Sequence, residues 1–264
     1  MQFDVQFTDV SAPWPQTLAC VLAAEETGFG AVWVLDHFSG DMFGSTSALE
    51  CFTHLGALAS ATTSIGLGTL VANVANRHPG LLAASAATVQ HISGGRLILG
   101  LGAGTSPSST FAAEQIALGV DIPESLAQRH ARVGAALDLF DELWSPDRDD
   151  RWRGFARPAP IPPVIIGLNS GPLATLAGQR ADGMNVRWNH PRLAELLAAG
   201  RDAFSGRPGS WLPTVWMPWD PDVLDADHPE RRRLDALGID RIVLCWFRVA
   251  PTVDELERCR GLLV

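Results

Sequence analysis

The chain of 264 residues contains no tyrosine, and it has only four methionines and four cysteines. The cysteines show no C-x-x-C spacing, and the first two fall in helix-like stretches. They are Cys20, Cys51, Cys245 and Cys259. We therefore expect four ordinary buried thiols, of the kind that proteins keep in a reducing cytoplasm.

No apolar run is long enough to span a bilayer, although 47% of the residues are hydrophobic. The first residues lack a basic region followed by an apolar one, so we expect no secretory signal and a cytoplasmic location. There is also no basic stripe, and the formal charge of -9 argues against a nucleic-acid partner. Backbone amides and a few arginines can still hold phosphate, so an anionic cofactor remains compatible with this charge.

Two motifs are missing near the start of the chain. A metal-dependent amidohydrolase barrel would show a His-x-His pair on its first strand, and residues 3–7 have none. No cluster of His, Cys, Asp and Glu elsewhere has metal-ligand spacing. A doubly wound dinucleotide-binding sheet would show G-x-G-x-x-G after its first strand, and residues 3–11 contain no glycine.

Eight apolar, strand-like segments alternate with eight helical patterns along the chain. The predicted strands are 2–7, 31–36, 65–71, 96–102, 163–168, 183–188, 212–217 and 241–247, and the predicted helices are 15–28, 47–61, 79–92, 124–144, 171–181, 190–204, 228–238 and 252–262. This alternation is typical of a (β/α)8 TIM barrel. At this length we expect one domain, residues 1–264.

The fourth predicted strand carries the densest glycine pattern. It follows the turn Ser93–Gly95 and ends in Gly102, Ala103 and Gly104, where a barrel strand reaches its carboxyl end. Active sites of barrels lie at that end. Glycine there lets a flat ligand approach the backbone.

The ends of the second and third strands carry polar groups. The second strand closes in Asp36, His37 and Phe38, and the third is followed by Arg77. In order and spacing, the segments GFGAVWVLDHF, IGLGTLV, RHP and SGGRLILGLGAG resemble the luciferase-like monooxygenase superfamily, most closely its coenzyme F420-dependent branch. The resemblance covers most of the chain and is strongest over residues 20–104.

The resemblance implies roles for the Asp-His pair and for the third strand. His37 would be the acid/base beside the reacting carbon, and Asp36 would neighbour the deazaflavin. Leu70 and Val71 stand where many members have a non-prolyl cis peptide that backs the cofactor ring. Without the resemblance, the Asp-His pair could merely cap the next element, and Leu70-Val71 could be an ordinary trans strand end.

A second set of positions suits the cofactor phosphate. Gly167, Asn169, Ser170 and Gly171 lie where a strand passes into a helix with Pro172 in its first turn. Free amides and a hydroxyl would point out of a positive helix end, and relatives use this loop for phosphate. The alternative is a simple Ser or Asn helix cap. Close backbone approach at Gly102, Ala103 and Gly104 would complete the channel.

The sequence also departs from the family pattern. Flavin-using luciferases carry a phosphate-binding arginine where this chain has Ala103, which favours F420 over FMN. Some F420-dependent sugar-phosphate dehydrogenases have a glutamate where this chain has Thr105, so we do not expect that substrate and look elsewhere for a second proton relay. Arg77 could meet the anionic cofactor tail or simply order its loop. The stretch 212–240 leaves only a reduced insertion near strand seven.

Aromatic residues and long loops complete the prediction. Trp188, Trp219 and Trp246 fall near the carboxyl ends of predicted strands, as Phe38 does, and would line a pocket for an apolar or planar substrate. Ordinary packing or a subunit interface is the alternative. The long loop 105–123 should lie at the catalytic mouth, and the loop 145–163 at the opposite end of the barrel.

These patterns predict an F420-dependent oxidoreductase that transfers hydride between the deazaflavin C5 and a small organic substrate. One alternative is an FMN-dependent monooxygenase, which would need a separate flavin reductase. Another is a non-catalytic flavin- or F420-binding barrel. Relatives are usually dimers, so a homodimer is expected.

Overall fold

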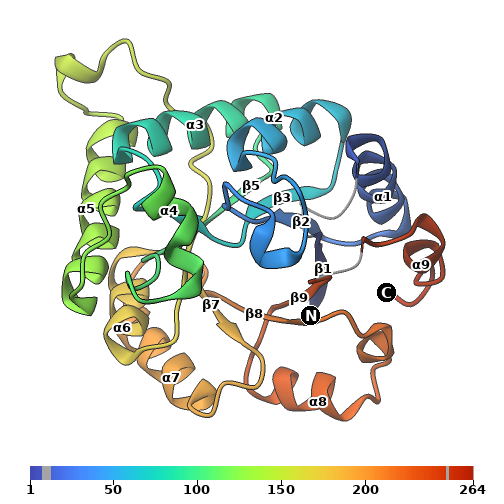
Figure 1. The fold of residues 1–264 in the computed structure, drawn as a ribbon. Coiled ribbons are helices and arrows are strands. Elements are labelled where there is room, and N and C mark those ends of the chain that lie inside the picture. The colour runs from blue at the N-terminus through green and yellow to red at the C-terminus, as the bar shows by residue number, and fades with distance from the viewer. Residues whose placement is uncertain (8–12, 248–249, 264) are drawn as a thin grey trace.

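The computed structural model describes residues 1–7, 13–247 and 250–263. Its nine parallel strands form one sheet, in the order β3-β2-β1-β9-β8-β7-β6-β5-β4. An additional pairing of β3 with β5 closes the sheet into a barrel (Figure 1). The strands are β1 (Gln2–Gln6), β2 (Ala31–Val34), β3 (Gly66–Thr69), β4 (Ala72–Asn73), β5 (Leu97–Gly102), β6 (Val164–Gly167), β7 (Gly183–Arg187), β8 (Leu212–Pro218) and β9 (Arg241–Cys245).

The short strand β4 continues the line of β3 along the same neighbour, β5. These two strands therefore share one place, and the remaining seven bring the barrel to eight places. All eight predicted strands are present. The (β/α)8 barrel expected from the sequence is confirmed.

Helices surround the barrel and cover its outer face (Figure 1). They are α1 (Trp14–Thr27), α2 (Cys51–Ala61), α3 (Pro79–Ile92), α4 (Ala113–Ala117), α5 (Leu126–Trp144), α6 (Gly171–Arg180), α7 (Leu193–Phe204), α8 (Pro229–Ala236) and α9 (Val253–Glu257). Helix α2 begins later than predicted because Glu50 is its N-cap, and its carboxylate accepts a hydrogen bond from the amide of Thr53. The extra helix α4 lies within the long loop 105–123.

Large side chains fill the interior of the barrel. The inner cluster consists of Ala31, Trp33, Ile98, Ile165, Val243 and Cys245. The indole of Trp33 fits because Gly68 has no side chain: a Cβ there would lie 2.3 Å from the ring. Trp33 donates from Nε1 to Asp4, 2.9 Å away, and Asp4 pairs with Arg241 at 2.6 Å. Burial raises the pKa of Asp4 despite the opposing effect of Arg241.

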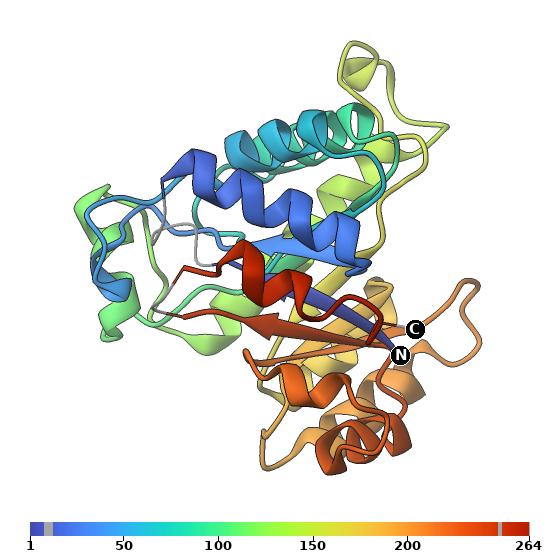
Figure 2. The same cartoon turned by 90° about the vertical axis from the view of Figure 1, so that its right-hand side faces the viewer.

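The two long loops lie at opposite ends of the barrel (Figure 2). Residues 105–123 contribute to the cavity at the carboxyl ends of the strands, as predicted. Residues 145–163 project at the end of the barrel where the strands begin, also as predicted (Figure 2).

All four cysteines are buried and none forms a disulfide bond, which confirms the prediction of buried thiols. Burial raises the pKa of Cys20, Cys245 and Cys259. In the described part of the chain, no helix is both long and apolar enough to cross a membrane.

Candidate functional site

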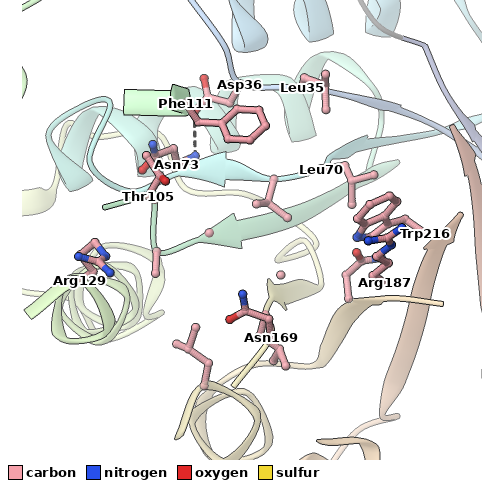
Figure 3. A pocket seen from close by; sticks show the side chains of 18 of the residues that line it. Leu35, Asp36, Leu70, Asn73, Thr105, Phe111, Arg129, Asn169, Arg187 and Trp216 are labelled. Atoms are coloured by element: carbon pink, nitrogen blue, oxygen red, sulfur yellow. Dashed lines mark hydrogen bonds between the residues drawn. The ribbon is translucent and has the colours of Figure 1, made fainter. Parts of the chain in front are cut away.

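A cavity of about 780 Å³ opens at the carboxyl ends of the strands (Figure 3). This volume lies within the range of small-molecule and cofactor sites. Residues at or just after the ends of all nine strands and residues of the loop 105–123 line it. They include Gln6, Asp36, His37, Leu70, Val71, Gly102, Ala103, Gly104, Thr105, Phe111, Arg129, Gly167, Asn169, Asn185, Arg187, Trp216, Cys245 and Phe247.

The peptide bond between Leu70 and Val71 is cis, as the resemblance implied. It joins β3 to β4, and both side chains line the cavity. A Cβ at Gly102 would lie 2.4 Å from a methyl carbon of Val71, and one at Gly167 would lie 2.7 Å from the other. These two glycines on β5 and β6 therefore make room for Val71. The backbone and Val71 together form a low surface at the base of the cavity.

Asp36 lies behind this surface in a buried ion pair. Its Oδ1 is 2.6 Å from Nη2 of Arg77, and its Oδ2 accepts hydrogen bonds from Nη1 of Arg77 and from the amide of Asn73, each 2.8 Å long. The two side chains are 1% and 8% exposed. Burial acts to lower the pKa of Arg77, but the hydrogen bonds and charge of Asp36 outweigh burial, so the pKa of Arg77 is raised. The carboxylate thus holds the end of β4 at Asn73.

Arg77 does not line the cavity, and a second carboxylate, that of Glu50, also lies 3.2 Å from its guanidinium. This placement contradicts the expectation that Arg77 meets a cofactor tail. The arginine neutralises Asp36 and orders the loop after β4, the alternative considered from the sequence. Both oxygens of Asp36 are engaged, so this residue organises the site and has no free oxygen with which to move a proton.

His37 has a partner that the sequence did not reveal. Its Nδ1 lies 2.7 Å from Oε1 of Glu114 on α4, and the other oxygen of Glu114 accepts hydrogen bonds from the amides of Phe38 and Ser39 at 2.7 and 2.8 Å. Burial raises the pKa of Glu114, but these hydrogen bonds outweigh burial and hold the pKa below its usual value. An ionised carboxylate can only accept, so Nδ1 carries the proton.

Aromatic rings border the imidazole. The ring of Phe43 packs edge-on at 5.1 Å, and that of Phe111, from the loop 105–123, lies 6.2 Å away. Phe111 also lines the cavity and is 47% exposed. The long loop therefore supplies both the carboxylate that holds His37 and a ring beside it.

Ser170 is the N-cap residue of α6, yet its side chain makes no cap hydrogen bond. Its Oγ is buried and has no hydrogen-bond partner among the described residues. The neighbouring Asn169 lines the cavity (Figure 3). Ser170 and Gly171 themselves are not among the residues that line the cavity. A hydroxyl at a helix N-terminus without a protein partner can donate a hydrogen bond to an anion bound beside it. The simple-cap alternative is not what the structure shows for this serine.

The aromatic prediction requires correction. Phe38, Trp188, Trp219 and Trp246 do not line the cavity. Trp219 and Trp246 stack on each other with ring centroids 3.8 Å apart and pack against the core outside the barrel. The tryptophan that does line the cavity is Trp216. Side chains alternate along a strand, so proximity to a strand end did not decide which face each ring occupies.

The cavity has an unexpected balance of charge. Among the described residues, its lining contains one carboxylate, that of Asp36, which is paired with Arg77. It also contains two arginines, Arg129 and Arg187, and neither has a carboxylate within 4 Å in the part of the chain that the structure describes. In Figure 3 the two arginines lie at opposite sides of the pocket. Sequence reasoning did not single out either of them.

Comparisons with known proteins agree with this geometry. Over 181 residues the chain is 36% identical to an F420-dependent glucose-6-phosphate dehydrogenase of Nakamurella multipartita, a match that covers 64% of this chain and 51% of that protein. It is 34% identical over 249 residues to the enzyme of the same name from Microbacterium testaceum, covering 88% of this chain and 68% of that protein. The chain thus spans about half to two thirds of these relatives.

A solved structure shares the fold over the whole chain. It is an F420-dependent secondary alcohol dehydrogenase in complex with an F420-acetone adduct, with a TM-score of 0.78 and 18% sequence identity, and the match covers 100% of this chain and 98% of that one. The family model described as luciferase-like monooxygenase matches residues 2–210. The chain therefore belongs to the luciferase-like monooxygenase family.

Proposed function

We propose that this protein binds coenzyme F420 and catalyses hydride transfer between its deazaflavin ring and a small organic substrate, with His37 as the acid/base. One observation carries the proposal: a carboxylate-held imidazole and the Leu70-Val71 surface face the same cavity. The relatives named as F420-dependent dehydrogenases support the choice of cofactor.

The residues present fit such a cofactor. Leu70 and Val71 offer an apolar surface to a flat ring, and Gly102 and Gly104 keep the neighbouring backbone free of side chains. The unpartnered hydroxyl of Ser170 lies at the N-terminus of α6, where phosphate is favoured. When bound, F420 supplies a ring carbon, C5, that accepts or donates hydride.

His37 would manage the proton that accompanies the hydride. Because its Nδ1 proton is held by Glu114, the free Nε2 can accept a proton from a substrate hydroxyl. In the oxidative direction Nε2 takes the hydroxyl proton while hydride leaves the adjacent carbon. In the reductive direction the imidazolium returns that proton to the new alkoxide. The negative charge of Glu114 stabilises the imidazolium in both directions.

Thr105 lines the cavity at the position where some sugar-phosphate dehydrogenases have a glutamate. A hydroxyl cannot serve as a carboxylic acid at neutral pH, so we do not extend the named relatives' substrate to this chain. Glu114 comes from the same loop and reaches His37 instead. We propose that this His-Glu pair serves as the proton relay, since Thr105 cannot act as the acid that the glutamate provides in those relatives.

A second candidate function is that of an FMN-dependent monooxygenase with a separate flavin reductase. The description of the matching family favours it. Ala103 in the cavity lining argues against it, because that position holds the phosphate-binding arginine in flavin-using luciferases. For either function we propose a cytoplasmic homodimer, whose mass light scattering would test.

The test is equilibrium binding of oxidised F420 and of FMN to the purified protein, measured by fluorescence at matched salt. We expect preference for F420, weaker F420 binding in Ser170→Ala, and unchanged binding in Ser205→Ala, which alters an exposed serine after α7. Preference for FMN would favour the monooxygenase. Binding of neither cofactor would contradict both functions.

A further inference from the structure

The cavity is cationic although the chain is acidic. The formal net charge is -9, yet the one lining carboxylate is neutralised by Arg77, while Arg129 and Arg187 have no acidic partner among the described residues. A cationic pocket in an acidic protein concentrates anions at that place. The two arginines differ in what they already do.

The guanidinium of Arg129 already forms hydrogen bonds within the protein. Its side chain is nearly buried, and Nη1 donates hydrogen bonds to the carbonyls of Pro123 and Glu124 at 2.8 and 2.7 Å. These bonds tie the start of α5 to the loop before it. Arg129 therefore has a structural task that accounts for its position.

Arg187 has no comparable hydrogen bonds to described residues. It is exposed at the carboxyl end of β7, and no hydrogen bond from its guanidinium to a described residue is found. The guanidinium carbon lies 5.2 Å from the ring centre of Trp188 and 5.7 Å from that of Trp216. Stacking on these two rings holds the guanidinium plane in place while its N-H groups stay available. Figure 3 shows Arg187 beside Trp216 at the edge of the pocket.

Arg187 ends β7, whose one neighbour, β6, carries the expected phosphate residues, and the guanidinium of Arg187 lies against Trp216 on the other neighbour, β8. Strand β8, which carries Trp216, is the fourth strand from β3 in either direction around the closed sheet. A flat ligand that rests on Leu70 and Val71 therefore turns its other face toward Trp216. Phe247 packs edge-on against Trp216 at 5.6 Å and also lines the cavity. This side offers aromatic surface next to a free cation.

We propose that Arg187 binds an anionic group of the substrate, a carboxylate or a phosphate ester, while Trp216 and Phe247 contact its planar or apolar body. The inference rests on the proposed function, since it assigns the substrate side of the same cavity. A guanidinium donates two parallel hydrogen bonds to either anion, so the geometry is the same for both. The residue sets specificity and takes no part in the transfer of hydride.

The experiment compares three probes of one shape on the F420-loaded protein by isothermal titration calorimetry: benzoate, phenyl phosphate and neutral benzamide. We expect at least one anion to bind about tenfold to a hundredfold more tightly than benzamide. Arg187→Gln should abolish this preference and leave benzamide binding unchanged. Arg187→Lys, which keeps the charge but loses the planar fork, should retain part of it. Arg153→Gln, on the exposed loop 145–163, serves as the control.

Each result decides the proposal. If only one anion shows the preference, the substrate carries that group. If wild type binds benzamide as tightly as both anions, or if the preference survives Arg187→Gln, the proposal is wrong. If Arg187→Gln weakens F420 binding instead, Arg187 belongs to the cofactor site and the proposal is also wrong. If wild type fails to bind F420, the proposed function fails, and the same probes on the cofactor-free protein still test the anion preference.

Discussion

Two walls of the cavity differ in whether their charged groups have partners within the protein. The wall formed after β2, here called the paired wall, presents Asp36 and His37, which form ion pairs with Arg77 and Glu114 behind it. The opposite wall, here called the open wall, consists of Arg187, Trp216 and Phe247, and its cation has no acidic partner in residues 1–7, 13–247 or 250–263. Charges satisfied within the protein fix the shape of a site, whereas an unsatisfied charge marks where a ligand supplies the partner.

The largest expected effect is on turnover at the paired wall. His37→Ala should lower kcat by about 10² to 10⁴-fold, the usual contribution of a general acid/base. F420 affinity, followed by fluorescence, should change little. His91→Ala, in the last turn of α3 and away from the cavity, is the control. A variant that keeps its kcat would remove His37 from the mechanism.

The next prediction compares how much the arginine associated with each wall contributes to the stability of the fold. Arg77→Gln leaves the buried carboxylate of Asp36 without its cation and should lower the free energy of unfolding by about 3 to 5 kcal/mol. Arg187→Gln should change it by less than about 0.5 kcal/mol, since no described acidic partner is lost. Urea denaturation of both variants measures the contrast. Equal losses in the two variants would erase the distinction between the walls.

A smaller kinetic effect is expected at Glu114. Glu114→Gln keeps an oxygen near His37 but loses the charge that stabilises the imidazolium, so kcat should fall by about tenfold to a hundredfold. KM should change little, because Glu114 acts on the imidazole and does not line the cavity. Glu124→Gln, which is exposed, should leave kcat unchanged. An unchanged kcat in Glu114→Gln would remove the carboxylate from the proton relay.

The smallest effect is the pH dependence of stability at the same carboxylate. The pKa of Glu114 is lowered from 4.5 in the folded protein, so its ionised form stabilises the fold above pH 4.5, and this contribution is lost as the pH falls through the lowered pKa. Wild type should therefore exceed Glu114→Gln in free energy of unfolding at pH 7, with the difference shrinking below pH 4.5. Urea melts at a series of pH values measure this. A difference that grows toward acid would contradict the assignment.

The sequence predicted what depends on local pattern. Alternation of apolar and helical segments gave all eight strands, and the family resemblance placed the cis bond at Leu70-Val71. The sequence could not predict contacts between segments that are far apart along the chain. Glu114 lies 77 positions from His37, and its only signal was the unusual length of its loop. The sequence left two roles open for Arg77 and could not choose between them, because its partner, Asp36, is 41 positions away.

The aromatic residues show a different limit. Trp216 faces the cavity from β8, whereas Trp219, just after the end of that strand, packs against the core. The phase of side chains at a strand end depends on where the strand stops, and this is the least certain part of a sequence-based prediction.

The indole of Trp33, which occupies the space left by Gly68, determines from which side a ligand can reach the cavity. Together with Ile98, Ile165 and Val243 it fills the inner barrel beneath the cavity. The cavity is therefore closed at its inner end by packed side chains, so a ligand enters it from the carboxyl ends of the strands, and a change in the packing around Trp33 would alter the floor of the cavity without touching its mouth.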